Sequence, residues 1–160
     1  MAGSRHGCLE TDRWGATLST RQIHVFISHS WWYSGHYDKL AEWIFGERWS
    51  VGQASLDLRD YSVPANDPIH NARSDQVLQQ AIFKQIAMSH VIVIPTGMYA
   101  NYSTWIGKEI EGAAGYRKPI LAVNPWGQVR TSSVVANVAT KVVGWNKQPI
   151  IDGIWALYQC

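Results

Sequence analysis

The sequence predicts an α/β fold, in which helices cover both faces of a mostly parallel sheet. The first observation is alternation, because short β-branched runs are followed by longer segments with helical periodicity. The second is the run "HVIVIP" at 90–95, which is continuously apolar, as strands buried on both faces are. The third is length, because 160 residues make one domain that buries roughly 70% of its extended surface. A single packed sheet is therefore expected.

Five segments are predicted as strands. The first, "IHVFIS" at 23–28, is β-branched and aromatic. The second, "ASLDLRD" at 54–60, alternates polar and apolar residues and is expected to be an outer strand. The run at 90–95 is the third strand, and "KPILAVNP" at 118–125 is a fourth, again apolar. "TKVVGW" at 140–145 is the short last strand.

Helices are predicted between these strands and after them. Apolar residues recur at helical spacing in 37–49 and again in 75–89. A third helix lies within 100–119, where Ser103 can cap its start and Gly115 can supply a left-handed stop. The last two predicted helices span 131–139 and 149–158.

Five strands that alternate with helices favour a flavodoxin-like three-layer sandwich with the strand order 2-1-3-4-5. In that order a ligand crevice forms at the carboxyl ends of the first and third strands, where the chain reverses direction. The segments that follow those strands are "SHSWWYSGHY" and "TGMYANYSTW", and both are rich in polar and aromatic residues. A ligand site is therefore expected at this edge of the sheet.

One carboxylate in the third helix, Glu109, lies four residues after Trp105 and so on the same helical face, bordering the crevice. The pattern alone leaves two interpretations open. Glu109 is either a solvated glutamate, like Glu111 on the same helix, or a functional group at the rim of the crevice. "SHSWWY" is equally open, because Ser30 and Trp31 fit an ordinary turn as well as a ligand-binding cluster.

Composition argues against several classes of function. The net charge is +2 and no basic run occurs, so nucleic-acid binding is not expected. Neither a signal segment nor a bilayer-long apolar run occurs, which favours a cytoplasmic protein without a membrane partner. Cys8 and Cys160 predict neither a disulfide framework nor a metal site. Residues 1–22 are polar and aperiodic, so a flexible N-terminal arm is expected before a single domain at 23–160.

Three stretches, "HVFISHSW", "HVIVIP" and "WIGKEIEGAAGYRKPILAV", resemble a TIR-like domain. The resemblance is to the branch found in bacterial anti-phage defence, particularly the TIR subunit of Thoeris systems, and it covers roughly residues 23–155. Its most specific element is Trp105-x-x-x-Glu109, which small residues and a new strand follow. In enzymatic TIR domains the glutamate at that place is catalytic, so the resemblance implies this role for Glu109.

The resemblance implies an NAD+ nucleosidase or ADP-ribose cyclase. NAD+ would be cleaved at its nicotinamide–ribose bond, as a substrate and not as a cofactor, and no metal is expected. In Thoeris-type proteins the product is a signalling nucleotide, often a cyclic ADP-ribose isomer, that activates a separate effector. Residues 61–74 fall where the family has its BB loop, which implies self-association through this loop and the helices.

Substrate contacts are expected from residues that follow the strands and from the start of the third helix. Trp31, Trp32 or Tyr33 can stack on the nicotinamide or the adenine, and Trp105 can wall the site. The expected substrate-binding residues are Ser28, His29, Ser30, Trp31, Tyr33, Tyr61, Met98, Tyr102 and Trp105.

A single carboxylate suffices for such a reaction. Ordinary glycosidases need two, because their leaving group must be protonated, whereas nicotinamide is cationic in NAD+ and leaves as a neutral molecule. One glutamate can then stabilise the developing ribose cation. Two rival functions stay open. One is a non-enzymatic TIR adaptor or scaffold that acts by self-association, and the other is a different flavodoxin-like ligand binder, such as an FMN protein or a nucleoside deoxyribosyltransferase.

Overall fold

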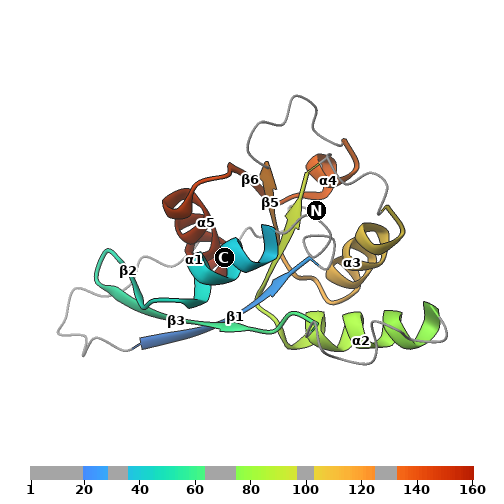
Figure 1. The fold of residues 1–160 in the computed structure, drawn as a ribbon, viewed down its shortest axis with the longest axis horizontal. Coiled ribbons are helices and arrows are strands. Elements are labelled where there is room, and N and C mark those ends of the chain that lie inside the picture. Colours follow the sequence, from blue (N-terminus) through green and yellow to red (C-terminus); the bar gives the residue numbers. More distant parts are fainter. Residues whose placement is uncertain (1–19, 29–35, 64–74, 97–102, 125–132) are drawn as a thin grey trace, which may run out of the picture.

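The computed structural model describes residues 20–28, 36–63, 75–96, 103–124 and 133–160. Within these ranges the chain forms an α/β fold, with a six-stranded mixed sheet and helices on both of its faces (Figure 1). The predicted α/β class is confirmed, but the prediction of five strands is wrong.

Five of the six strands run parallel to one another. The strands are β1 (Thr20–Ile27), β2 (Trp49–Val51), β3 (Ala54–Asp60), β4 (Val91–Pro95), β5 (Ile120–Asn124) and β6 (Lys141–Gly144). Their spatial order is β2-β3-β1-β4-β5-β6. All neighbours from β3 to β6 in that order are parallel, and these five strands have the predicted relative order 2-1-3-4-5. The carboxyl ends of β1 and β4 therefore meet at the point where the strand order reverses.

The additional strand, β2, runs antiparallel to β3 at the edge of the sheet. A tight turn joins the two strands, and in it Gly52 has a φ of 59°, a conformation that favours glycine. Periodicity did not predict β2 because three residues are too few to show alternation. Consequently β3 lies between β2 and β1 and is not an edge strand, so the prediction that residues 54–60 form an outer strand is wrong.

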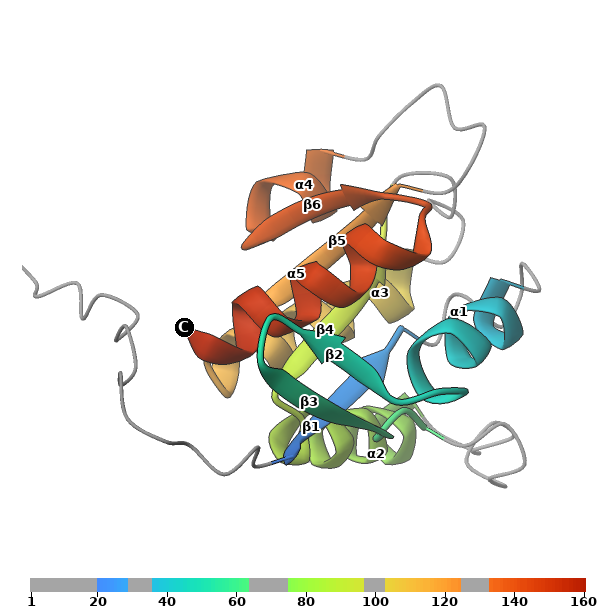
Figure 2. The same cartoon turned by 90° about the vertical axis from the view of Figure 1, so that its left-hand side faces the viewer.

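Helices cover the sheet in two layers. They are α1 (His36–Phe45), α2 (Asp75–Met88), α3 (Ser103–Gly115), α4 (Ser133–Val138) and α5 (Lys147–Gln159). α1 and α5 lie on one face, whereas α2 and α3 lie on the other (Figure 1), and Figure 2 is turned so that α1 and α5 face the viewer. Every predicted helix is present, although α1 ends at Phe45 and not at 49.

The core lies along the central strands. All five residues of β4 are buried, and Phe26 and Ile27 of β1 are fully buried beside them. α5 approaches β5 closely at Gly153, where a Cβ atom would come within 2.9 Å of Leu121 Cδ1. Burial of this apolar surface stabilises the sheet and so fixes the positions of its strand ends.

The end of α3 differs from its predicted form. Gly115 was expected to be the left-handed residue, but that conformation belongs to Arg117, whose φ is 54°. The backbone N–H of Lys118 donates to the carbonyl of Ala113 (2.8 Å), and that of Arg117 donates to Ala114 (3.2 Å). This is the bonding of a Schellman turn, which closes the helix around a residue that carries a side chain.

The ends of the chain correct two smaller expectations. β1 begins at Thr20, so residues 20–22 belong to the sheet, while the rest of the predicted arm, 1–19, lies outside the described residues. Cys160 is disulfide-bonded, which cysteine number and spacing did not indicate. Among the described residues, no helix has the length and hydropathy needed to cross a membrane.

Candidate functional site

The carboxyl ends of the central strands bring buried hydroxyl groups to one edge of the sheet. Ser28 directly follows β1, and its backbone N–H donates to the carbonyl oxygen of Val93 in β4 (2.8 Å). Thr96 directly follows β4, and its hydroxyl donates to Oδ1 of Asn124 at the end of β5 (2.6 Å). Ser28 and Thr96 are both fully buried. The sheet itself therefore determines where these hydroxyls lie.

Glu109 of α3 meets this edge. Its side chain is 0% exposed, and the Ser28 hydroxyl donates to Glu109 Oε2 at 2.5 Å. Glu111, two residues further along the same helix, is exposed. A buried carboxyl group is costly unless hydrogen bonds compensate for lost water, and the Ser28 hydroxyl supplies such a bond. Glu109 is thus an inward-facing group at the switch point of the sheet, and the interpretation as a solvated glutamate is wrong.

Packing between α3 and α2 sets the direction in which Glu109 points. A Cβ atom at Gly112 would lie 2.9 Å from Ile86 Cδ1 and 3.0 Å from Phe83 Cδ1, so α3 approaches α2 closely there. Ile106 is also buried. Because Ile106, Glu109 and Gly112 are spaced three residues apart, they share one helical face, and burying that face turns Glu109 towards the sheet.

A second polar cluster lies at the same edge, and the sequence analysis did not identify it. The hydroxyl of Tyr37 in α1 donates to Asp60 Oδ2 (2.5 Å), and the backbone N–H of Ser62 donates to Asp60 Oδ1 (2.9 Å). Ser62 Oγ accepts a hydrogen bond from the backbone N–H of Ile27 (2.8 Å). Burial, and then the bond to Asp60, raises the pKa of the Tyr37 hydroxyl above its usual value. Tyr37 therefore remains a donor throughout the neutral range.

The expected substrate-binding residues are only partly described. Ser28 lies beside Glu109, as expected. Trp105 lies in the first turn of α3, but its side chain is outside what the structure describes. The expected residues that lie wholly outside the described ranges are His29, Ser30, Trp31, Tyr33, Met98 and Tyr102.

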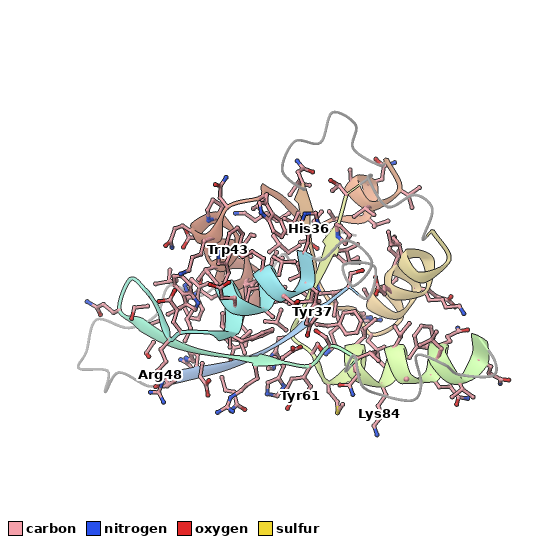
Figure 3. All side chains as sticks on the ribbon, viewed as in Figure 1. His36, Tyr37, Trp43, Arg48, Tyr61 and Lys84 are labelled. Atoms are coloured by element: carbon pink, nitrogen blue, oxygen red, sulfur yellow. The ribbon has the colours of Figure 1, made fainter. Side chains whose placement is uncertain are left out.

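Tyr61 packs elsewhere. Its backbone N–H donates to the carbonyl of Val25 (2.9 Å), and its ring stacks on the imidazole of His24 at a centroid distance of 4.0 Å. His24 precedes Ser28 by four residues, which is roughly 13 Å along a strand. Figure 3 shows Tyr61 at the lower border of the molecule and Tyr37 nearer its middle. The ring of Tyr61 is therefore placed at His24, and no described contact joins it to Glu109.

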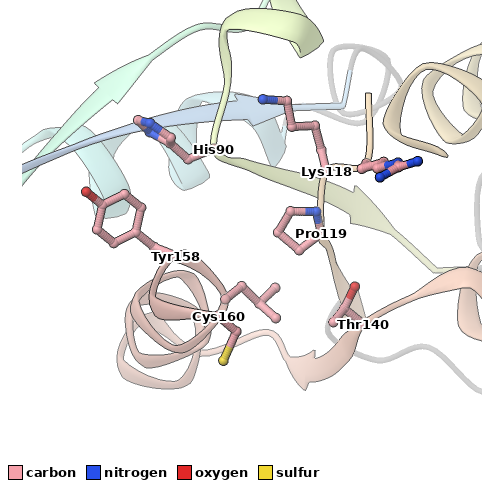
Figure 4. A pocket seen from close by; sticks show the side chains of 8 residues that line it. His90, Lys118, Pro119, Thr140, Tyr158 and Cys160 are labelled. Carbon is pink, nitrogen blue, oxygen red and sulfur yellow. The ribbon is translucent and has the colours of Figure 1, made fainter. Parts of the chain in front are cut away.

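A cavity of about 550 Å³ lies at the opposite edge of the sheet (Figure 4). It is lined by residues that precede β4, β5 and β6 and by the end of α5, namely His90, Arg117, Lys118, Pro119, Thr140, Leu157, Tyr158 and Cys160. The cavity is thus at the amino ends of the strands and apart from Glu109. In the described part of the chain, no group of three or more His, Cys, Asp or Glu residues could hold a metal ion.

A model of the family described as "Thoeris protein ThsB, TIR-like domain" matches residues 26–130. The match covers more than half of the chain and contains both Ser28 and Glu109. This chain belongs to that family. The resemblance seen in the sequence is confirmed, and membership places the chain in anti-phage defence.

Comparison with other known proteins adds little to the family match. No curated protein matches the chain. A CMP N-glycosidase of Clostridium botulinum, BcmB, is similar in structure with a TM-score of 0.44 and 9% identity, covering 83% of this chain and 98% of that one. A 3-dehydroquinate dehydratase-like protein of Bifidobacterium longum has a TM-score of 0.43 and 12% identity, covering 86% and 94%. At these TM-scores neither likeness bears on the chemistry of this chain.

The ThsB-type TIR-like match ends before the last helices and strand of the domain. It runs from the last two residues of β1 through β5, and it includes every residue of the candidate site. β6 and α5 lie beyond it, although α5 packs on β5 at Gly153 and so belongs to the same folded unit. The site of this Thoeris TIR-like domain is therefore built from the elements that the family model covers.

Proposed function

We propose that this Thoeris TIR-like domain cleaves NAD+ at the bond between nicotinamide and ribose and makes an ADP-ribose-derived, cyclic signalling nucleotide. The observation that supports the proposal is the buried carboxyl group of Glu109, which bonds the Ser28 hydroxyl at the carboxyl edge of the sheet. Ligands of open α/β sheets bind at such a switch point. Glu109 is the proposed catalytic residue.

The reaction needs negative charge beside the ribose and little else. When the bond between ribose C1′ and the nicotinamide nitrogen breaks, its electron pair stays with the nitrogen and neutral nicotinamide leaves. The positive charge passes to the ribose, where a carboxylate stabilises the transition state. A nucleophilic atom of the adenosine half then bonds to C1′ and releases a proton to solvent. In hydrolysis, water takes the place of that atom.

The surroundings of Glu109 suit this role. Electrostatic attraction between a carboxylate and a developing cation is much stronger in a site that excludes water than in bulk solvent. The Ser28 hydroxyl donates to one carboxylate oxygen of Glu109 and so orients the group. The proposed roles are therefore Glu109 as the electrostatic catalyst and Ser28 as the residue that orients it.

A non-enzymatic scaffold is the second candidate, and one observation favours it. The Ser28–Glu109 bond joins β1 to α3, residues 81 positions apart, so the same contact can serve the fold alone. If the protein is a scaffold, loss of the Glu109 carboxylate lowers the stability of the fold but abolishes no enzymatic activity, because there is none. Self-association through 61–74 and a separate effector for the product are proposals under either account, as is a cytoplasmic location.

The proposal is tested by incubating the full chain with NAD+ and separating the products by chromatography. The wild type is expected to release nicotinamide together with a cyclic ADP-ribose isomer, and Glu109→Gln is expected to release neither. Glu111→Gln is the matched control, because Glu111 lies on the same helix but is exposed. A wild type that is inert at high concentration and after exposure to infected-cell lysate would support the scaffold and exclude the enzyme.

A further inference from the structure

We infer that Tyr37, Asp60 and Ser62 form a positioning network, which holds Ser28 and through it the carboxyl group of Glu109 in the orientation that the reaction requires. The inference rests on the proposed function, because it concerns the same site. The hydrogen bonds described for the three residues join them to one another and to Ile27. They are therefore positioning residues and not catalytic ones.

The first part of the network replaces a missing bond of the sheet. The register between β1 and β3 ends at Val25 and Asp60, and the N–H of Tyr61 makes the last backbone bond across the pair. Beyond that point Ile27 still has an N–H to satisfy, and the hydroxyl oxygen of Ser62 accepts it (2.8 Å). Ser62 is buried, with 7% exposure. A side chain thus holds the last residue of β1.

The second part fixes Ser62 itself. Asp60 Oδ1 accepts from the N–H of Ser62 two residues later (2.9 Å), which is the bonding of an Asx turn. The other carboxylate oxygen of Asp60 accepts from the Tyr37 hydroxyl (2.5 Å). Tyr37 is itself buried in α1. Both oxygens of Asp60 are therefore bonded, so the turn that carries Ser62 is anchored to a helix.

The third part connects this anchor to Glu109. Ile27 and Ser28 are adjacent, and the N–H of Ser28 bonds Val93 on the other side of β1. Ile27 is therefore held from the segment after β3 and Ser28 is held from β4, and the Ser28 hydroxyl donates to Glu109 (2.5 Å). Since α1 lies on one face of the sheet and α3 on the other (Figure 1), the network crosses the sheet at its carboxyl edge.

The network predicts a specific kinetic defect when a link is removed. Glu109 acts mainly in the transition state, so misalignment lowers kcat more than it raises KM. For NAD+ cleavage we expect Tyr37→Phe and Ser62→Ala to lower kcat about tenfold with KM changed less than about twofold, on the scale of small positioning errors. In Asp60→Asn the amide oxygen still accepts from the Ser62 N–H, and the amide nitrogen donates to the Tyr37 oxygen, which reverses that bond but keeps the same groups joined, so most of kcat is expected to remain.

Matched controls separate positioning from general loss of stability. Ser89 is a fully buried serine at the opposite edge of the sheet, and its hydroxyl donates to the carbonyl of Gln85 (2.7 Å). Tyr158 lines the cavity at that edge. Ser89→Ala and Tyr158→Phe are expected to leave kcat unchanged per folded molecule. Equal kcat values for Ser62→Ala and Ser89→Ala, at equal folded fraction, would overturn the inference.

A second measurement needs no activity and so separates this inference from the proposed function. Hydrogen exchange at the Ile27 amide is expected to accelerate at least about tenfold in Tyr37→Phe, although Tyr37 does not touch Ile27. The Ile120 amide, which donates to Thr140 Oγ1 (3.1 Å) at the opposite edge, is the internal control and should not change. If the wild type cleaves no NAD+, the proposed function fails, and the exchange rate of Ile27 alone decides the network. Unchanged exchange at Ile27 would overturn it.

Discussion

Hydroxyl groups donate hydrogen bonds to two carboxylates at the carboxyl edge of the sheet. Ser28 donates to Glu109 and Tyr37 donates to Asp60, each at 2.5 Å. A buried carboxylate that loses its donor retains the full cost of its lost hydration, which exceeds the net value of an ordinary hydrogen bond. Glu109 is fully buried whereas Asp60 is exposed, so removing the Ser28 hydroxyl is expected to matter more than removing a hydroxyl from the protein surface.

Ser28→Ala tests this difference. We expect the free energy of unfolding to fall by about 1–3 kcal/mol, because Glu109 keeps its burial but loses a donor. Urea denaturation measures the change. Ser50→Ala, at an exposed serine of β2, is the control and should stay within about 0.5 kcal/mol of the wild type. Equal effects of the two substitutions would contradict the described role of Ser28.

The sequence predicted Ser28 and Glu109 as site residues, but it did not predict the residues that hold them in place. Ser28 and Glu109 were expected because polar residues follow a strand and because the Trp105–Glu109 spacing resembles that of TIR-like domains. Tyr37, Asp60 and Ser62 were not expected. Their bonds join residues 23 and 35 positions apart, and helical or strand periodicity carries no information about such pairs.

At the scale of the elements, the packing of α3 determines the direction in which the Glu109 side chain points. Gly112 permits the close approach of α3 to α2, and the Schellman turn around Arg117 ends the helix before β5. From the sequence, Gly112 was only one of the small residues that follow Glu109, and the left-handed residue that ends the helix was expected at Gly115. β2 was missed because its three residues pair with β3 and show no pattern alone. Short elements that depend on a partner are thus the ones that local patterns do not reveal.

Two glycines of α3 provide a matched pair of substitutions. Gly112→Val would push into Ile86 and Phe83, so we expect the free energy of unfolding to fall by about 1–3 kcal/mol, as in other overpacked cores. Gly107→Val meets no atom within 4 Å and should be neutral or slightly stabilising. Thermal unfolding followed by circular dichroism measures both. A neutral Gly112→Val would show that α3 does not depend on this contact.

In the whole molecule, two groups of polar residues lie at opposite ends of the parallel strands. Glu109 and the positioning network lie at the carboxyl edge, while the cavity and the histidine pair His24 and His90 lie at the amino end of β4. The relative order of the five parallel strands was predictable, because alternating strands and helices have few ways to form one sheet. The antiparallel strand and the disulfide at Cys160 were not, since both depend on long-range pairing.

His90, at the amino end of β4, is expected to make the stability of the protein depend on pH. His90 Nδ1 accepts from the backbone N–H of His24 (2.9 Å), which requires the unprotonated nitrogen. Burial, and then the charges of His24 and Lys118, lowers the pKa of His90 below 6.5. The unfolded chain then binds a proton more readily than the folded one, so stability falls as pH falls through about 6.5.

His90→Asn tests this dependence, because an asparagine oxygen can accept the same bond but does not titrate. Urea unfolding between about pH 7 and pH 5 is expected to show a shallower loss of stability in His90→Asn than in the wild type. Identical slopes in the two proteins would exclude His90 as a source of the acid lability.

The central claim is that Glu109 is catalytic and not merely structural, and one rate ratio tests it most directly. The measurement is the initial rate of nicotinamide release from NAD+ by Glu109→Gln relative to Glu111→Gln, each divided by its folded fraction. The account predicts a ratio of about 10⁻² or lower, in line with the loss of one preorganised electrostatic group. A ratio near one would contradict it.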